Sequence, residues 1–320
     1  MRLAVSSHTR LRHCCAARRR LPNGLDVETV SSADVAFIYD EVFNQRCYSP
    51  PGYLLPAGGL VVDVGANIGL FSLWAAQQIA PGGTLLACEP APACVTVLKR
   101  NLARHAPGVD ARVLPLALGS AAGQAQLTFY SRLTGWSSLK PDDAEVARNV
   151  CAFSRASLSD ALGSLFAPLR RAAPFLERLR GSRQPAGVAG WLARISSAVY
   201  AFLFNVVLTV LRSGAETHIV RVVTLSQLLS DEHLLHRPIA LLKIDVERAE
   251  LDVLRGVAPA DWRNIRAVAA EVHDYDGRLA EVLALLRTHG FDVTSEQPAS
   301  LKDSNLHMVY ATRSLAEMDT

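Results

Sequence analysis

Short apolar runs and amphipathic segments alternate along the chain from residue 60 onward. The runs LVVDVG, TLLACE and ARVLPLAL are separated by two segments of helical periodicity, one ending near residue 80 and one spanning 93–105. Such a strand–helix–strand–helix–strand order favours a parallel sheet with right-handed crossovers. The first half of the chain therefore predicts an α/β domain.

The same rhythm resumes further along the chain. The runs IALLKID and IRAVAAEV alternate with helical segments at about 249–254 and 279–289. The last two runs, FDVTSEQ and LHMVYATR, alternate in polarity and are joined by a polar loop, so we expect them to pair antiparallel at one sheet edge. Together the runs predict a doubly wound, mostly parallel seven-stranded sheet with an antiparallel C-terminal edge strand.

Composition divides the chain into five segments. The first twenty residues carry several arginines and no acid, which we interpret as an unstructured or mis-started N-terminus rather than a transit peptide. The stretch 152–216 interrupts the strand and helix rhythm with a basic amphipathic section, a Pro/Gly break and a long apolar run. The predicted segments are a disordered N-terminus at 1–20, a helical cap at 21–58, the two halves of the α/β domain at 59–151 and 217–320, and a hydrophobic and basic helical insertion at 152–216.

The apolar run ISSAVYAFLFNVVLTVL covers residues 195–211 and has an arginine at each end. It is slightly shorter than the roughly 20 apolar residues of a membrane-spanning helix. A buried or lid helix and a membrane-surface helix are equal alternatives, because basic flanks suit anionic headgroups. A single span is disfavoured, since the two halves of one sheet must lie on the same side of the bilayer. We expect a cytoplasmic protein, with membrane association through 195–211 as an alternative.

Charge and cysteine content exclude several classes of function. A formal net charge of +3 is too small to indicate a nucleic-acid partner. The six cysteines show neither zinc-type pairs nor a dense disulfide pattern, which suits a reducing compartment. The composition therefore indicates no structural metal.

A glycine turn joins the first predicted strand to its helix in VVDVGANIGLFSLWAA. A dinucleotide-binding turn reads G-x-G-x-x-G, and its second glycine lets a pyrophosphate approach. Asn67 stands at that position, and the carboxylate of Asp63 would repel a phosphate but suits an ammonium group, as in S-adenosylmethionine. Gly65 and Gly69 still allow close approach of the backbone and close helix packing.

Glu89 is the second residue that helps to identify the cofactor. It ends the TLLACE strand about 20 residues beyond Gly69, where folds of this kind place an acid on the ribose hydroxyls. Asp63 and Glu89 would thus bracket an adenosine that carries a cationic amino acid. The predicted cofactor is S-adenosyl-L-methionine, bound by Asp63, Gly65, Ala66, Asn67, Gly69 and Glu89.

Ionisable residues gather at the end of a central strand in LLKIDVERAELDVLRG, residues 241–256. The carboxyl ends of strands are where open α/β sheets bind ligands. Acids in the first turn of a helix also favour the helix dipole, without any functional role. That alternative accounts for Glu250, less well for Asp245, and poorly for Lys243 inside an apolar strand.

DVGANIGLFSLWAA and LLKIDVERAELDVLRG together resemble the FkbM family of S-adenosylmethionine-dependent methyltransferases, whose second signature normally reads K-[IV]-D-V-E-G-A-E. The resemblance extends from about Leu21, through YDEVFNQRCY, to Arg313, and leaves out the insertion and the first twenty residues. It implies a class I methyltransferase, Rossmann-like fold. It also implies O-methylation of a hydroxyl on a small molecule, such as a secondary metabolite, a sugar or a lipid.

Arg248 departs from the family pattern, because that position is usually glycine. If the backbone there has a positive φ, arginine costs about 1 kcal/mol or more and must be compensated. The same side chain would equally place a cation at the mouth of the substrate site. We expect Glu247, Arg248 and Glu250 to bind the substrate or to organise the loop.

Methyl transfer from a sulfonium is an in-line displacement, so the protein must align the hydroxyl and take its proton. His273, which follows the IRAVAAEV strand, is the predicted base because imidazole titrates near neutral pH. A surface or hydrogen-bonded histidine is an equal alternative. Asp245 is the second candidate for the base, or the group that orients His273, and Lys243 would pair with Asp245 or Glu271.

A divalent cation held by the acids after residue 244 is disfavoured, because no histidine lies at ligand spacing beside them. Two other functions stay open. A nicotinamide-dependent reductase would use the same sheet, although the middle glycine is missing. A membrane-associated binding protein without turnover is motivated by Arg248 and by the insertion.

Two further groups of residues lie outside these motifs, one in a polar loop and one aromatic. Trp136, Ser137 and Ser138 in TGWSSL either cover the cofactor or form a plain connection. Tyr39, Phe43 and Tyr48 are spaced like one face of a helix, which we interpret as packing first and a cofactor lid second.

Overall fold

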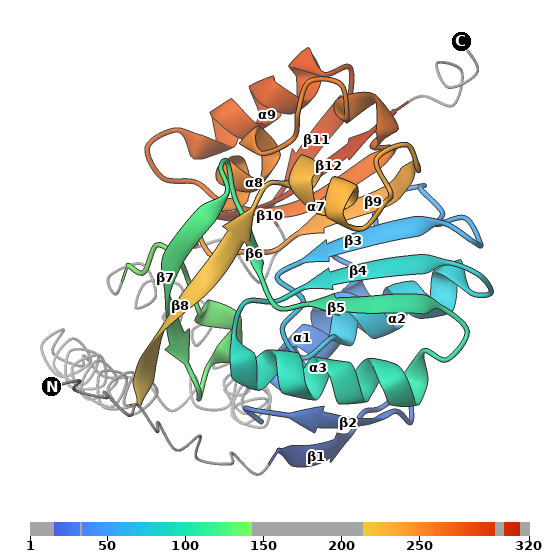
Figure 1. Ribbon diagram of the computed structural model, residues 1–320, viewed down its shortest axis with the longest axis vertical. Coiled ribbons are helices and arrows are strands. Elements are labelled where there is room, and N and C mark those ends of the chain that lie inside the picture. The colour runs from blue at the N-terminus through green and yellow to red at the C-terminus, as the bar shows by residue number, and fades with distance from the viewer. Residues whose placement is uncertain (1–15, 33, 143–213, 298–303, 314–320) are drawn as a thin grey trace, which may run out of the picture.

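The computed structural model describes residues 16–32, 34–142, 214–297 and 304–313 of the 320-residue chain (Figure 1). The run 195–211, nearly all of the predicted insertion and the first fifteen residues lie outside the described residues, so the roles expected for them stay predictions. Among the helices that the structure describes, none is long and apolar enough to cross a bilayer.

A seven-stranded sheet forms the centre of the fold, with the strand order β11-β12-β10-β9-β3-β4-β5 (Figure 1). β12 runs antiparallel to both of its neighbours, and the remaining pairs are parallel. The predicted doubly wound, mostly parallel sheet is confirmed, and its reversed C-terminal strand lies second from the edge. The strands are β3 (Leu60–Val64), β4 (Thr84–Cys88), β5 (Asp110–Leu114), β9 (Ile239–Ile244), β10 (Ala267–His273), β11 (Asp292–Glu296) and β12 (Leu306–Thr312).

The central strands β3, β4 and β9 are fully buried and mostly apolar because helices cover both faces of the sheet. Alternate residues of a strand point to opposite faces, and on β3 Leu60, Val62 and Val64 belong to one core cluster while Val61 belongs to the other. The first cluster includes side chains of α7, α8 and α9, and the second includes side chains of α1, α2 and α3. This double cover directs ligands to the strand ends. The helices are α1 (Val35–Tyr39), α2 (Leu70–Ile79), α3 (Pro92–His105), α7 (Leu225–Asp231), α8 (Glu250–Arg255) and α9 (Arg278–Thr288).

A two-stranded sheet lies at the N-terminal side of the fold. It pairs β1 (Ala17–Arg20) antiparallel with β2 (Asp26–Thr29). The prediction of an unstructured N-terminus is therefore wrong for residues 17–20, because their charged side chains lie on an exposed strand without an apolar pattern. The cap predicted at 21–58 contains β2 as well as helix, so it is helical only in part.

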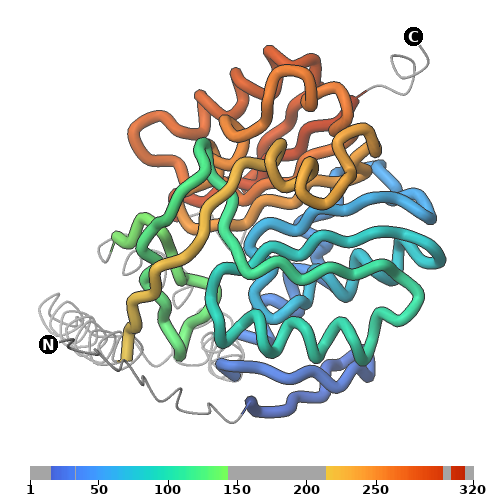
Figure 2. The backbone as a smooth tube through the Cα atoms, viewed as in Figure 1, coloured from blue at the N-terminus to red at the C-terminus, as the bar shows by residue number. Residues whose placement is uncertain are grey.

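A third sheet has the order β6-β8-β7, with β6 (Ala117–Leu118), β7 (Gly123–Tyr130) and β8 (Ala215–Val223). Figure 2 shows β7 and β8 side by side, and Tyr130 lies opposite Ala215 in their antiparallel register. The sequence did not predict β8, and its first two residues fall in the segment assigned to the insertion. The long connection between the two strands thus starts and finishes at the same end of this sheet.

α1 continues into a π-helix, η1 (Asp40–Gln45). Tyr39 and Phe43 stack on each other with ring centroids 4.9 Å apart. Tyr48 follows the helix and packs edge-on against Phe71, at 5.7 Å. These contacts agree with packing as the main role of the three aromatic residues.

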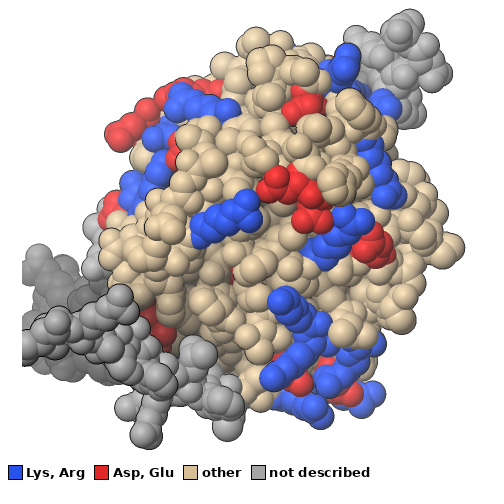
Figure 3. Space-filling model, viewed as in Figure 1, with Lys and Arg blue, Asp and Glu red and all other residues tan. Residues whose placement is uncertain are grey.

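Basic side chains gather at the bottom of the face drawn in Figure 3, where Figure 1 shows β1, β2 and α3, and acidic side chains lie among them. Arg18, Arg100 and Arg104 lie 3.5, 3.0 and 3.6 Å from the carboxylate of Glu28. The hydrogen bond from Arg100 is the main reason that the pKa of Glu28 is lowered. These arginines therefore serve a local ion-pair network between the N-terminal sheet and α3.

Candidate active site

A cavity lies at the carboxyl ends of β3, β4, β9 and β10. The turns after these strands, the α1–η1 helix and the segment 134–142 form its walls. β3 lies between β4 and β9, where the strand order changes direction, and open α/β sheets bind ligands at such points. The residues singled out in the sequence that line the cavity are Tyr48, Gly65, Ala66, Asn67, Glu89, Trp136, Ser137, Ser138, Lys243, Asp245, Glu247, Arg248 and Glu271; Tyr39, Phe43, Asp63, Gly69, Glu250 and His273 lie outside it.

The glycine turn requires its glycines for two different contacts. Gly65 has φ +81°, and a Cβ there would lie 1.8 Å from the backbone oxygen of Asp245. Gly69 has φ +95°, and its Cβ would lie 2.6 Å from the Leu98 side chain on α3. Gly65 thus lets the ends of β3 and β9 approach, and Gly69 lets α2 and α3 pack.

Glu89 is buried at the end of β4 and presents its carboxylate at the cavity. Its two oxygens accept hydrogen bonds from the backbone N–H groups of Asn67 and Ala91, both at 2.8 Å. Burial raises the pKa of Glu89 to about 7, against the effect of these two donors. Asn67 itself has φ +50°, a conformation that asparagine tolerates better than most residues.

Asp63 lies outside the cavity, contrary to the position that the cofactor role predicted for it. It is fully buried on the face of β3 that packs on α2, where Ser72 donates a hydrogen bond to it. In the sheet register Asp63 lies directly opposite Lys243, and Lys243 Nζ is 3.0 Å from its carboxylate. Its charge is therefore neutralised inside the protein and does not face a ligand.

Lys243 is a buried cation shared among three acceptors. Besides Asp63, its Nζ lies 3.2 Å from Asp245 and donates to the backbone oxygen of Gly65 at 2.9 Å. Burial alone would lower the pKa of Lys243, but Asp245 and Asp63 outweigh it, so the pKa is raised. Lys243 stays charged and fixes the end of β3 to the end of β9.

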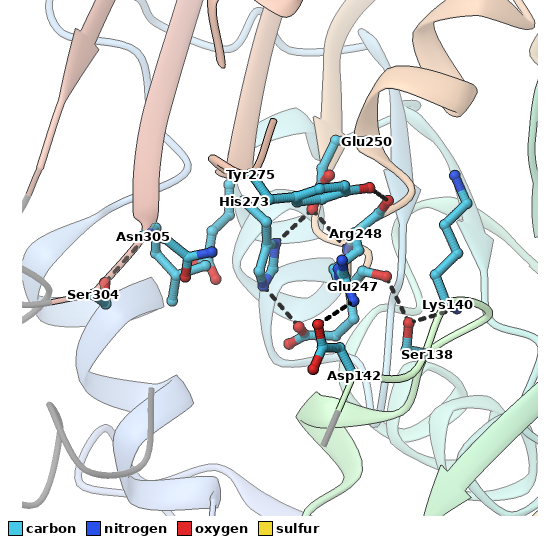
Figure 4. A network of polar contacts seen from close by, with 12 residues as sticks. Ser138, Lys140, Asp142, Glu247, Arg248, Glu250, His273, Tyr275, Ser304 and Asn305 are labelled. Carbon is cyan, nitrogen blue, oxygen red and sulfur yellow. Dashed lines mark hydrogen bonds and ion pairs between the residues drawn. The ribbon is translucent and has the colours of Figure 1, made fainter. Parts of the chain in front are cut away.

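His273 is buried between two carboxylates rather than at the cavity (Figure 4). Its Nδ1 lies 2.6 Å from Glu250 and its Nε2 lies 2.8 Å from Glu247. Burial alone would lower the pKa of His273, but the two glutamates raise it well above the usual value. A histidine that is protonated on both ring nitrogens has no lone pair for a substrate proton, so the geometry disfavours the predicted base.

Glu250 organises the loop after β9. One of its oxygens, Oε1, faces both His273 Nδ1 and the backbone N–H of Arg248, which donates at 3.0 Å. The side chain is buried beside these two donors and takes no part in the cavity wall. Of the two predictions for Glu250, loop organisation agrees with this position.

Arg248 has a left-handed backbone, with φ +69°, and several contacts compensate for it (Figure 4). Its guanidinium lies 2.9 Å from Asp142 and 4.3 Å from the centre of the Tyr275 ring. The Tyr275 hydroxyl donates to the Arg248 carbonyl at 3.0 Å. Arg248 thus joins the loop after β9 to the segment 134–142 at the cavity wall.

Side-chain contacts hold the segment 134–142 against the cavity. Thr134, in the short helix η2 (Thr134–Trp136), donates to the Asn67 side chain at 3.0 Å. Ser138 donates to the Glu247 carbonyl at 2.7 Å (Figure 4). Trp136 and Ser137 also line the cavity, so this segment belongs to the site rather than being only a connection.

The family model described as "Methyltransferase FkbM domain" matches residues 63–293. The chain belongs to the FkbM methyltransferase family. The match includes the glycine turn, Glu89 and the loop after β9, which carried the resemblance. The FkbM chain is therefore an enzyme, a methyltransferase that depends on S-adenosylmethionine.

Two relatives align with nearly the whole of this chain. The 31-O-demethyl-FK506 methyltransferase FkbM of Streptomyces tacrolimicus is 38% identical over 294 residues, which are 92% of this chain and 96% of the relative. Methyltransferase sdnD of Sordaria araneosa is 30% identical over 295 residues, 90% and 94% of the two chains. A solved methyltransferase FkbM from Methylobacillus flagellatus KT has 12% identity and a TM-score of 0.43, over 85% of this chain and 47% of its own.

The cavity of this FkbM chain fits the adenosine part of S-adenosylmethionine. Glu89 presents a buried carboxylate of the kind that can accept ribose hydroxyls, and Leu116 and Leu118 are apolar wall residues that suit a planar base. Gly65, Ala66 and Asn67 also line the cavity, so the backbone of the glycine turn borders the space for the adenosine. Among the described residues, no group of three or more His, Cys, Asp or Glu side chains is arranged to hold a metal ion.

Among the cavity residues, Glu41 was missed as a site candidate, Tyr48 was predicted only as packing or a lid, and Glu271 only as a partner of Lys243. Glu41, Tyr48 and Glu271 line the cavity, and Tyr48 donates to Glu271 at 3.4 Å. Burial, followed by the charge of Asp245, raises the pKa of Glu271 to about 8. The acids within YDEVF and at the end of IRAVAAEV were visible in the sequence, but nothing in the sequence showed that these segments meet.

Proposed function

We propose that the enzyme transfers the methyl group to a hydroxyl of a small molecule, with Asp245 as the proton acceptor. The observation that carries this proposal is the position of Asp245 at the cavity, with its side chain 35% exposed and Lys243 Nζ at 3.2 Å. S-adenosylmethionine supplies a methyl group made electrophilic by the positive sulfur. The relative from Streptomyces tacrolimicus is named for an O-demethylated small molecule, which supports the same acceptor class.

Asp245 is better placed than His273 to take the proton. Its carboxylate reaches the cavity, whereas both nitrogens of His273 face glutamates. Lys243 orients the carboxylate of Asp245, with Nζ 3.2 Å from it. His273 acts as a positioning residue, because it holds Glu247 at the cavity wall.

Glu89 and the turn residues 65–67 are the groups that we propose to hold the cofactor. The carboxylate of Glu89 accepts ribose hydroxyls while the N–H groups of Asn67 and Ala91 keep it in place. Glu247 and Arg248 line the wall on the side of the loop after β9, where they would contact the acceptor. The guanidinium of Arg248 does so from its fixed position between Asp142 and Tyr275.

The acceptor atom is tested by labelling. The purified enzyme is incubated with S-adenosylmethionine carrying a ¹³C-methyl group and an extract of the source organism, and the labelled product is examined by NMR. A methyl ether is the expected product. Label on nitrogen, sulfur or carbon would refute O-methylation while leaving the family assignment intact.

The proton acceptor is tested with Asp245→Asn and His273→Gln on the product so identified. Loss of a positioned base typically costs 10²–10⁴-fold, so Asp245→Asn should lower kcat by about that factor. His273→Gln should retain more activity, because the histidine acts through Glu247. If His273→Gln instead lowered kcat more than Asp245→Asn, with both variants folded by circular dichroism, His273 would be the base.

A further inference from the structure

Glu41 is a buried acid at the cavity that the function described so far does not use. It lies in η1 with an exposed fraction of 8%, and it lines the cavity. No hydrogen bond or ion pair reaches its carboxyl group from any residue that the structure describes. By contrast, Asp245 has Lys243, Glu271 has Tyr48, and Glu247 has His273 as a partner.

A buried carboxyl group without a donor is energetically unfavourable, so a ligand that brings a donor would be bound there. Burial, followed by Glu271 and Asp245, raises the pKa of Glu41 well above its usual value. The other charged groups that act on it are Lys243, which lowers its pKa, and Asp40, which raises it. Lys243 is already engaged by Asp63, Asp245 and Gly65, so the protein has no second cation to offer among these groups.

The surroundings of Glu41 suit a cationic donor. Phe37 lies one helical turn before it and also lines the cavity, as do Tyr48 and Phe71. Aromatic faces and carboxylates together are a common environment for ammonium groups. The three acids Glu41, Asp245 and Glu271 also line this part of the cavity, so a bound cation would find several oxygen acceptors there.

The methyl donor carries an ammonium group on its methionine portion, remote from the adenosine. Asp63, which the sequence predicted as the partner of that group, is fully buried against Lys243 and does not reach the cavity. Glu89, the acid suited to the ribose, lies at the end of β4, whereas Asp245 and Glu271 lie after β9 and at the end of β10. The charges of these last two acids act on Glu41, and Glu89 is not among the charges that do.

We propose that Glu41 binds the ammonium group of the methionine portion of S-adenosylmethionine, in place of the role expected for Asp63. The carboxylate accepts hydrogen bonds from the ammonium, and Asp245 at the same cavity adds a favourable field. This assignment concerns the methyl donor alone, so it stands or falls independently of which acceptor atom is methylated.

Calorimetric titration of the full chain with two ligands tests the proposal. S-adenosylhomocysteine keeps the amino-acid portion, whereas 5′-methylthioadenosine keeps the adenosine and the sulfur but lacks it. Glu41→Gln should weaken S-adenosylhomocysteine binding about 10- to 100-fold, which is the usual worth of a hydrogen bond to a charged group. It should leave the affinity for 5′-methylthioadenosine unchanged.

Asp40→Asn is the matched control on the same helix. Asp40 lies outside the cavity, and Asn44 and Gln45 each donate to it at 2.6 Å. Asp40→Asn should therefore change neither affinity. Two outcomes in Glu41→Gln would overturn the assignment. One is an equal loss of affinity for both ligands. The other is no loss of affinity for either ligand, which would indicate that Glu41 contacts the acceptor instead.

Proton release supplies a second readout. Burial and the neighbouring acids raise the pKa of Glu41, and a bound ammonium group would lower it, so S-adenosylhomocysteine binding should release protons. Titration in two buffers of different ionisation enthalpy measures this release. Glu41→Gln should reduce it, and an unchanged release would contradict the proposal.

Discussion

Arg248 combines an unfavourable backbone conformation with favourable side-chain contacts. A non-glycine residue at φ +69° costs about 1 kcal/mol, which the contacts with Asp142 and Tyr275 offset. Arg248→Ala and Arg248→Gly both remove these contacts, but only the glycine relieves the backbone. We expect the glycine variant to have a free energy of unfolding about 1 kcal/mol higher than the alanine variant, measured with urea.

The matched control for this comparison is Lys99, an exposed residue within α3. There the order should reverse, because glycine is less favourable than alanine in a helix by about 1 kcal/mol. If alanine were also the more stable replacement at position 248, the backbone strain would be absent.

Asp63 and Lys243 form a buried cross-strand ion pair. Removal of one partner of a buried pair costs about 3–5 kcal/mol, because the other charge is left uncompensated. Asp63→Ala should therefore lower the free energy of unfolding substantially, toward the smaller figure, since Lys243 keeps Asp245. Adding Lys243→Met should restore part of the loss.

Ser72→Ala is a milder control, since it removes only a hydrogen bond to Asp63 and should cost about 1 kcal/mol. If the Asp63→Ala protein were stable but no longer bound S-adenosylhomocysteine, Asp63 would be a cofactor-binding residue, as the sequence predicted.

At the scale of single residues, the predicted Gly65, Glu89 and Asp245 line the cavity, whereas Asp63, Gly69 and His273 lie outside it. The roles predicted for these residues stay predictions. Asp63 faces α2 because β3 pairs with β9 in a register that sets it opposite Lys243. That register depends on segments far apart in the chain, and no local pattern encodes it. His273 was placed at the correct strand end, but its two glutamate partners are fixed by the loop after β9.

At the scale of elements, β3, β4 and β9 were predictable because burial on both faces leaves nearly uninterrupted apolar runs. β8 was not predictable in this way, since its exposed residues interrupt the apolar pattern and it follows directly on the insertion. Its pairing with β7 is long-range in sequence. The sheet it builds was therefore visible only in the structure.

The antiparallel pairing of β7 and β8 predicts that the connection between them is dispensable for folding. Replacing residues 144–212 by a Gly/Ser linker of about 20 residues, which spans roughly 25 Å, should leave one cooperative thermal transition by circular dichroism. The physical reason is that both strand ends lie at the same end of one sheet. Loss of cooperativity would show that the connection contributes to the core.

The same variant tests the expected membrane contact of residues 195–211. If this run binds a membrane surface, the full chain should sediment with anionic liposomes and the linker variant should stay in the supernatant. Equal behaviour of the two proteins would favour the alternative of a buried or lid helix.

At the scale of the whole molecule, the raised pKa values make stability depend on pH. Glu89 has a pKa of about 7 and Glu271 of about 8, both above the ordinary 4.5, and His273 is raised as well. A raised pKa in the folded state stabilises below the unfolded pKa, and this contribution is lost as pH rises through the folded value.

The free energy of unfolding should therefore fall between pH 5 and pH 8. One pKa unit is worth about 1.4 kcal/mol, so Glu89 alone accounts for roughly 3 kcal/mol. Urea unfolding at several pH values measures the slope, and Glu89→Gln should flatten it. A free energy of unfolding that rises over this interval would contradict the raised pKa values of these buried acids.

The position of β3 between β4 and β9 has a consequence for biosynthesis. At about 5–20 residues per second, a ribosome needs roughly 10 to 35 s to make residues 65–238 after β3 has been completed. During this interval β3 is an unpaired edge that is apolar on both faces, and such edges promote aggregation. The yield of soluble protein should thus depend on translation rate and chaperone supply as much as on the stability of the finished fold.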